Sequence, residues 1–139
     1  MAAQAALTLL DGKATPVSHV FDPKGARESV SGKQVAQWRD QNFTNREAFW
    51  SIKEEHADPN KNGVEKFRYV IDLPTLESPA SGGTFAPPPT RAYGTMAVVE
   101  YWVHSRASAI ELADIVAIVK NFTASAYVAN AVTKREAAW

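Results

Sequence analysis

Short stretches rich in apolar residues, each of the length of a strand, recur along the N-terminal part of the chain between polar and turn-like segments. The first stretch is divided by Asp11-Gly12, a dipeptide that favours a tight turn between two strands. It ends before the turn-like segment 22–25, which contains Pro and Gly. The pattern therefore predicts an N-terminal β-hairpin over about residues 4–21.

Two further stretches, residues 46–55 and 65–73, alternate between apolar and polar residues and are joined by a loop rich in Pro, Asn and Gly. Their apolar residues fall on one side of each strand and most charged residues on the other, which indicates a hairpin with one dry and one wettable face. The last predicted strand, residues 91–103, is apolar on both sides in its second half, so alternation does not assign its faces. Together these stretches predict a sheet over about residues 33–103.

After residue 103 the spacing of the apolar positions changes to that of a helix, and Ser108 and Glu111 have the spacing of a capping box. The pattern predicts helices over about residues 107–121 and 124–138. The fold class is therefore α+β, a single domain over residues 1–139 in which the strands precede the helices. The second helix has a mostly alanine stripe that would bury little surface in its own chain, so we expect a partner chain to cover it.

Charge and cysteine content exclude several classes of protein. Fifteen Lys and Arg residues balance fifteen Asp and Glu residues, so the chain is neither a polybasic nucleic-acid arm nor an acidic tail. Without cysteine it forms no disulfide, thiolate zinc site or iron–sulfur cluster. The apolar N-terminus lacks the basic residues of a signal peptide, and Glu111 and Asp114 interrupt the most apolar later segment. We therefore expect a protein that is neither secreted nor embedded in a membrane.

Residues that carry catalytic or metal chemistry are scattered along the chain. Asp58, Asn60 and Asn62 match the first half of a calcium loop, but Tyr69 stands where a bidentate Glu is required, so this segment is interpreted as a hairpin turn. The three histidines are far apart and are each interpreted as surface or edge residues, at His19, His56 and His104. No metal site, cofactor or catalytic site is predicted, and the chain is not interpreted as an enzyme.

A more specific candidate is the polar side of the predicted sheet. If the odd positions of the last strand share that side, it carries Ser51, Lys53, Lys66, Arg68, Arg91, Tyr93 and Thr95. Such residues are common on solvated strand surfaces, and that simple interpretation stays open. They also suit a nucleic acid, because cations bind phosphates, hydroxyls bond to base edges and a tyrosine ring stacks on a base. Acidic residues on the same side weaken the second interpretation, at Glu47, Glu55 and Asp72.

Several local strings, in their order and spacing over the whole chain, resemble the coat proteins of single-stranded RNA bacteriophages, the levivirus family. The strings that carry the resemblance are Leu9-Leu10-Asp11-Gly12, Val35-Ala36-Gln37-Trp38, Tyr69-Val70-Ile71-Asp72-Leu73-Pro74, Arg91-Ala92-Tyr93-Gly94-Thr95-Met96 and the helix around Glu111.

The resemblance implies a five-stranded antiparallel sheet beside the N-terminal hairpin, and two helices that lie across the sheet of a partner chain. Two chains then form an intertwined homodimer with one continuous ten-stranded sheet, and about 180 copies form an icosahedral shell of T=3 type. The proline-rich loop over residues 75–90 corresponds to the family's loop around the fivefold and quasi-sixfold axes, with contacts expected at Ser81, Gly82, Gly83, Pro87, Pro88 and Pro89.

The resemblance also implies that coat dimers bind an operator hairpin in their own RNA genome, which represses replicase translation and marks the RNA for packaging. The corresponding positions are Val35, Ser51, Lys53, Arg68, Val70, Tyr93 and Thr95, with Tyr93 as the stacking residue. Arg91, from the polar side of the predicted sheet, completes the expected RNA-binding set. The expected partners are a second copy of the chain, the RNA and a maturation protein, and the expected location is the virion, assembled in the bacterial cytoplasm. The alternative is a dimeric RNA-binding regulator that never assembles.

Overall fold

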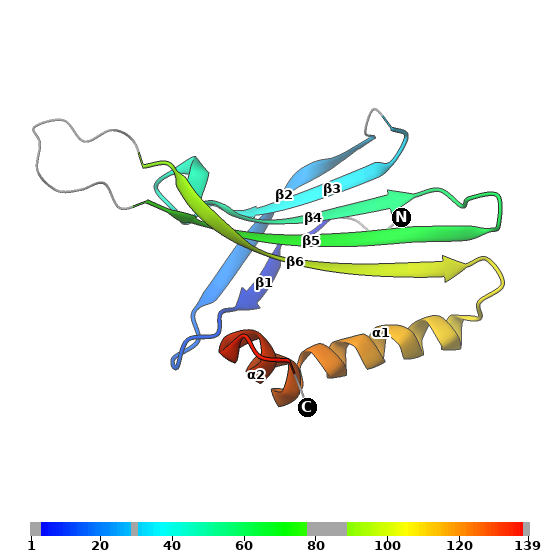
Figure 1. Cartoon of the computed structure of the whole chain (residues 1–139). Helices are drawn as coiled ribbons and strands as arrows, with labels where there is room; N and C mark the ends of the chain where they lie inside the picture. Colours follow the sequence, from blue (N-terminus) through cyan, green and yellow to red (C-terminus); the bar gives the residue numbers. More distant parts are fainter. Residues whose placement is uncertain (1–3, 29–30, 78–88, 138–139) are drawn as a thin grey trace, which may run out of the picture. The chain divides into compact units, whose positions relative to one another are not determined.

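The computed structural model describes residues 4–28, 31–77 and 89–137. Its elements are β1 (Leu7–Leu10), β2 (Ser18–Glu28), β3 (Gln34–Asp40), the 3₁₀ helix η1 (Arg46–Ala48), β4 (Trp50–Ala57), β5 (Val64–Leu76), β6 (Arg91–His104), α1 (Ala109–Thr123) and α2 (Ala126–Lys134). The six strands lie side by side in sequence order in one sheet (Figure 1). This arrangement confirms the predicted α+β class, with antiparallel strands first and two helices last.

Two compact units make up the chain, residues 1–102 and residues 103–139. The first unit contains nearly the whole sheet and the second contains both helices.

The core of the first unit lies on one face of the sheet. Cross-strand pairing places Trp38 of β3 opposite Ile52 of β4, and Ile52 opposite Ile71 of β5. Phe21, Trp38 and Ile52 form the buried cluster, against which Leu7, Ala36, Trp50 and Ile71 pack. Burial of a large apolar side chain contributes about 1.5–3 kcal/mol, and three of the four buried hydrophobic residues in the described part of the chain lie on this face.

Strand β2 is longer than the sequence pattern predicts. The pairing of β1 with β2 ends at Phe21, where the predicted hairpin ends, but β2 itself continues through the turn-like segment to Glu28. Pro23 pairs with Trp38 and Ala26 pairs with Ala36, so three steps along β2 match two steps along β3. Gly25, at a φ of 89°, lies in this bulge. The bulge takes up the extra residue and lets the strand resume its pairing with β3.

The loop between β4 and β5 is a compact turn, as the sequence predicts. The side-chain oxygen of Asn60 accepts hydrogen bonds from the backbone N–H groups of Asn62 and Val64, at 2.9 and 3.1 Å. Gly63 has a φ of 71°, which favours glycine. The Asn and Gly residues that resemble a calcium loop thus form the hairpin connection.

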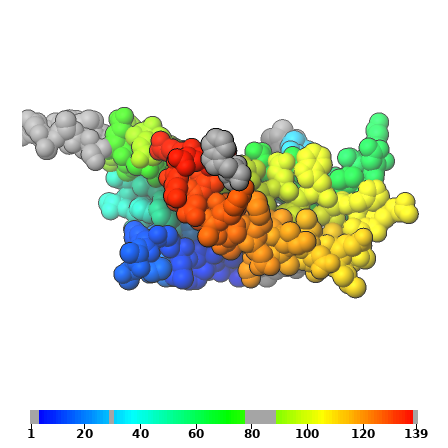
Figure 2. All heavy atoms as spheres, turned by 60° about the horizontal axis from the view of Figure 1, so that its bottom comes forward, coloured from blue at the N-terminus to red at the C-terminus, as the bar shows by residue number. Residues whose placement is uncertain are grey.

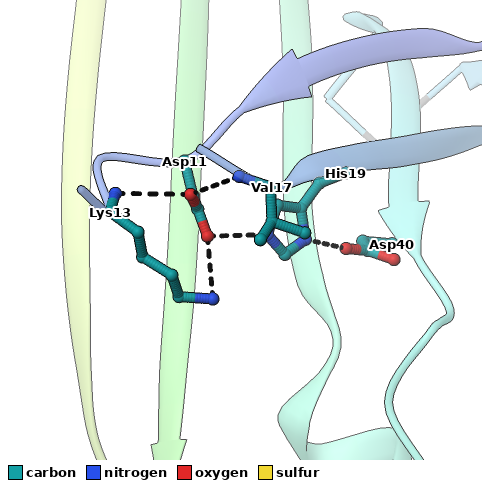
Figure 3. A network of polar contacts seen from close by, with 5 residues as sticks. All are labelled: Asp11, Lys13, Val17, His19 and Asp40. Atoms are coloured by element: carbon teal, nitrogen blue, oxygen red, sulfur yellow. Dashed lines mark hydrogen bonds and ion pairs between the residues drawn. The ribbon is translucent and has the colours of Figure 1, made fainter. Parts of the chain in front are cut away.

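His19 fixes the N-terminal hairpin to the sheet. Its Nδ1 lies 2.6 Å from a carboxylate oxygen of Asp40, which is fully buried, and its Nε2 lies 3.4 Å from Asp11 (Figure 3). The imidazole ring stacks on Trp50 with 4.4 Å between the ring centroids. The interpretation of His19 as a surface residue is therefore wrong: 13% of its side chain is exposed, and both nitrogens face carboxylates.

Asp11 also closes the turn that joins β1 and β2. Its carboxylate accepts hydrogen bonds from the backbone N–H groups of Val17 and Lys13, and it pairs with the Lys13 ammonium at 2.9 Å. The hydrogen bond from the Val17 N–H has the largest effect on the Asp11 carboxylate, and the contact with the Lys13 side chain has the next largest. Together they hold the pKa of Asp11 well below its ordinary value. The turn therefore depends on the ionised carboxylate.

Both helices of the second unit begin at serine caps. Ser108 and Glu111 form the predicted capping box, and the Ser125 hydroxyl accepts the N–H of Val128. Neither helix buries a residue; the atoms of both helices are coloured from yellow-orange to red in Figure 2. Apolar side chains of both helices are more than two-fifths exposed, at Ile110, Ile115, Val116, Ile118, Phe122, Tyr127 and Val132.

In the part of the chain that the structure describes, no single helix is long and apolar enough to cross a membrane. Helices α1 and α2 reach that length and composition only together, as a pair bent by 50°.

Candidate nucleic-acid interface

Opposite the core, the three central strands present a surface that we call the polar face. The pairs Gln37–Lys53 and Lys53–Val70 lie in register across β3, β4 and β5, and residues two positions away on each strand share their side of the sheet. The polar face consists of Val35, Gln37, Arg39, Ser51, Lys53, Glu55, Lys66, Arg68, Val70 and Asp72. Five of the eight RNA-binding positions expected from the sequence thus lie together, namely Val35, Ser51, Lys53, Arg68 and Val70.

Strand β6 contributes its even positions to the polar face. Glu100 contacts Arg68 and Lys66, and a Cβ added at Gly94 would meet Asp72 at 3.0 Å. On the other side of the strand, the ring of Tyr101 packs edge-on against Tyr69, which lies on the core face.

By the same alternation, Tyr93 and Thr95 point to the side of Tyr101 and away from Ser51 and Lys53. The expectation that the odd positions of this strand share the polar face is therefore wrong for these two residues. Sequence alternation could not assign the faces, because the second half of β6 is apolar at both parities.

Arg91 reaches the polar face from the start of β6. Its guanidinium forms two hydrogen bonds with the Asp72 carboxylate, at 2.7 and 3.0 Å. The guanidinium occupies the space of the missing Gly94 side chain, because a Cβ there would lie 1.7 Å from the Arg91 Nη2. Next to this ion pair the face is hollowed into a shallow pocket whose lining includes Arg39, Arg46 and Ser51.

A chain of ion pairs crosses the centre of the polar face. Glu55 contacts the ammonium of Lys53 and lies 3.8 Å from the Arg68 guanidinium. Glu100 lies 3.3 Å from the Arg68 Nε and 3.0 Å from the Lys66 ammonium. Because Lys53 donates a hydrogen bond to its carboxylate, with Arg68 adding to the effect, the pKa of Glu55 lies below its ordinary value.

The pairing of Glu55 and Glu100 with the cations was not among the features predicted from the sequence. The sequence does indicate that Glu100 has a cationic partner, because Glu100 is the single Asp, Glu, Lys or Arg residue in the strongly apolar second half of β6. A charged residue in such a segment is commonly paired.

The arrangement of these side chains suits the binding of a polyanion better than the catalysis of a reaction. It offers guanidinium and ammonium groups, a serine hydroxyl and the Gln37 amide on one surface of the sheet. Within residues 4–28, 31–77 and 89–137, no cluster of His, Asp and Glu side chains could hold a metal ion. Of the six loop positions expected at the capsid axes, five lie outside the described residues, and Pro89 is half-buried just before β6.

A model of the levivirus coat protein family matches residues 2–139. The chain belongs to this family. It is therefore a coat protein, a structural component of a virion capsid and not an enzyme, as the resemblance implied.

The fold is also that of solved phage structures. The virus-like particle of bacteriophage ESE058 matches with a TM-score of 0.87 and 22% identity, over 99% of this chain and 100% of the other. The virus-like particle of bacteriophage NT-214 has a TM-score of 0.85 and 27% identity over the same shares. The bacteriophage GA protein capsid is more distant, with a TM-score of 0.72 and 14% identity over 95% of each chain. A search of curated proteins gave no match to this coat protein.

Proposed function

We propose that this coat protein forms an intertwined dimer, that dimers assemble into an icosahedral shell around RNA, and that the polar face binds an operator hairpin of the genome. Hairpin binding would repress replicase translation and mark the RNA for packaging. The observation that carries the RNA-binding part is the set of cations and hydrogen-bonding groups gathered on one face of the sheet, opposite the core.

Two features support a second copy of the chain as the first partner. Strand β6 has fourteen residues at the edge of the sheet, and residues 91–98 are all exposed. A long edge strand with unpaired backbone groups is a template for another strand. Pairing with β6 of a second copy would join the two six-stranded sheets into one, in which β2 to β6 of both chains are the ten strands expected from the resemblance. Helices α1 and α2 bury no residue in their own chain, so they supply the apolar surface that a dimer would cover.

Particle formation is supported by the relatives. The structures from bacteriophages ESE058 and NT-214 are both virus-like particles, and each aligns over 99% of this chain. An icosahedral shell of T=3 type would place the loop between β5 and β6 around the fivefold and quasi-sixfold axes. A maturation protein would be a further partner of the assembled virion.

Expression of the coat protein alone in bacteria, followed by size-exclusion chromatography with light scattering and ultraviolet absorbance, tests assembly. We expect megadalton particles that contain nucleic acid. A species of about 30 kDa, twice the chain mass of 15.2 kDa, would instead identify a dimer that does not assemble. Deletion of residues 78–87 should preserve the dimer and abolish normal shells, whereas a non-assembling regulator would be unaffected.

The interface is tested by substitutions on both sides of the sheet. Lys53→Ala should weaken hairpin binding and reduce its salt dependence by up to about one phosphate contact. Tyr93→Ala should leave affinity unchanged if the RNA lies on the polar face. A loss of about 1–3 kcal/mol for Tyr93→Ala would show that a base stacks on the opposite side and would refute the proposed location.

A further inference from the structure

The cations at the centre of the polar face already have anionic partners within the chain. Glu55 contacts Lys53 and Arg68, and Glu100 contacts Arg68 and Lys66, the latter at 3.0 Å. Three cations and two carboxylates thus form one continuous network across β4, β5 and β6.

Glu55 and Glu100 hold the same positions relative to these cations that RNA phosphates would hold. A phosphate that approaches Lys53 or Arg68 meets a carboxylate bonded to the same donors, and the two anions repel each other. The pKa of Glu55 is lowered by these cations, so its carboxylate stays ionised when RNA arrives at neutral pH.

One buried donor in the network has no hydrogen-bond partner. The Nε of Arg68 lies 3.3 Å from a Glu100 oxygen, but its N–H does not point at an acceptor and it has no hydrogen-bond partner. Glu55 and Glu100 therefore leave one N–H of the Arg68 guanidinium unsatisfied. An RNA phosphate could satisfy this N–H only by displacing a carboxylate.

We propose that Glu55 and Glu100 are specificity-determining residues, which compete with RNA phosphates for Lys53, Lys66 and Arg68. This inference rests on the proposed function of the polar face in RNA binding. Contacts to phosphates carry no sequence information, so the competition weakens binding to every RNA backbone. An RNA then binds well only when base contacts add to the backbone contacts, which restricts occupancy of the face to a folded hairpin of matching shape.

The chain supplies a matched control in Glu54, which is adjacent to Glu55 but lies on the core face. Its carboxylate is 3.4 Å from the hydroxyl of Tyr69 and pairs with none of the polar-face cations. Glu54→Gln and Glu55→Gln therefore change the net charge equally. Only Glu55→Gln removes an anion from the network.

Fluorescence anisotropy with a labelled oligouridine of about twenty nucleotides, a probe without hairpin structure, tests the proposal at several salt concentrations. We expect Glu55→Gln to bind about three- to tenfold more tightly than wild type, because two cations lose their internal partner. Its salt dependence should steepen by up to about 0.7 in log–log slope, the value for one added phosphate contact on a single strand. Glu54→Gln should change the affinity less than about twofold.

Equal affinities of Glu55→Gln and Glu54→Gln would overturn the proposal. If circular dichroism shows that Glu55→Gln does not fold, Glu100→Gln on β6 replaces it. The proposal is then overturned if Glu100→Gln binds the oligouridine no more tightly than Glu54→Gln. Failure of wild-type protein to bind the oligouridine even at low salt, together with particles free of RNA, would refute RNA binding by the polar face itself. If wild-type protein binds the oligouridine and Glu55→Gln binds it no more tightly, only the proposed role of Glu55 and Glu100 is refuted.

Discussion

Asp40 is the residue whose substitution should most strongly destabilise the sheet. It is the one charged side chain among the described residues that is fully buried, and it lies at the end of β3 on the core face. One carboxylate oxygen accepts the N–H of Asn42 at 3.0 Å, and the other lies 2.6 Å from His19. The Asp40 side chain has no exposed surface, so these protein groups, and not solvent, satisfy its carboxylate.

The expected magnitude follows from these two contacts. A hydrogen bond to a charged group contributes about 1.5–3 kcal/mol, and an unsatisfied buried partner adds to the loss. Asp40→Ala should therefore lower the free energy of unfolding by about 3–5 kcal/mol. Asp40→Asn keeps the volume and an acceptor for Asn42 but weakens the bond to His19, so we expect about 1.5–3 kcal/mol.

Urea unfolding followed by tryptophan fluorescence at one fixed protein concentration measures these values, because Trp50 stacks on His19. Asp22→Asn is the control: it removes the same charge from a side chain that is not buried, and it should stay within about 0.5 kcal/mol of wild type. A double-mutant cycle with His19→Phe, which keeps an aromatic ring on Trp50, isolates the pair. A loss below about 1 kcal/mol for Asp40→Ala, or additive effects in the cycle, would refute the reasoning.

Three further predictions concern the hairpin, β6 and α1. The pKa of Asp11 is lowered in the folded state, so the contribution of its carboxylate to stability is complete above its ordinary pKa near 4 and is lost as the pH falls further. Asp11→Asn should therefore lose less stability than wild type when both are titrated with acid. Equal losses of stability in the two proteins would exclude this contribution. Gly94→Ala should displace Arg91 from Asp72 at a cost below about 1 kcal/mol, because the pair is partly exposed, and the loss should not add to that of Asp72→Asn in urea unfolding. Ser108→Ala should cost about 1 kcal/mol through loss of the α1 cap, measured by thermal unfolding, whereas Ser105→Ala, outside the capping box, should have little effect.

The faces of β4 and β5 could be predicted from the sequence because each of these strands has one face against the core. Ile52 and Ile71 are paired across the two strands, and a shift by one residue would move both into solvent. The capping box of α1 is equally local, since Ser108 and Glu111 lie one turn apart. Such features are determined by residues that are close together in the sequence, so they can be predicted from the sequence alone.

The features that escaped prediction depend on residues far apart in the chain or on departures from regular geometry. His19 and Asp40 are 21 positions apart, and nothing in either local pattern relates them. The bulge near Gly25 has the composition of a turn, and only the pairing with β3 shows that the strand continues. On β6 the side of Tyr93 is fixed by contacts of Glu100 and Tyr101 with β5, which alternation of apolar residues does not encode.

The small core of a single chain has a consequence for how this coat protein is produced. In the described residues the buried hydrophobic side chains are Phe21, Val35, Trp38 and Ile52, and neither helix adds to them. In the proposed dimer, folding of such a chain would be coupled to association, and the midpoint of unfolding would shift with the concentration of subunits by mass action. The rate of translation would therefore set the fraction of folded protein, with few native subunits early in synthesis and a steep increase once the chains become abundant.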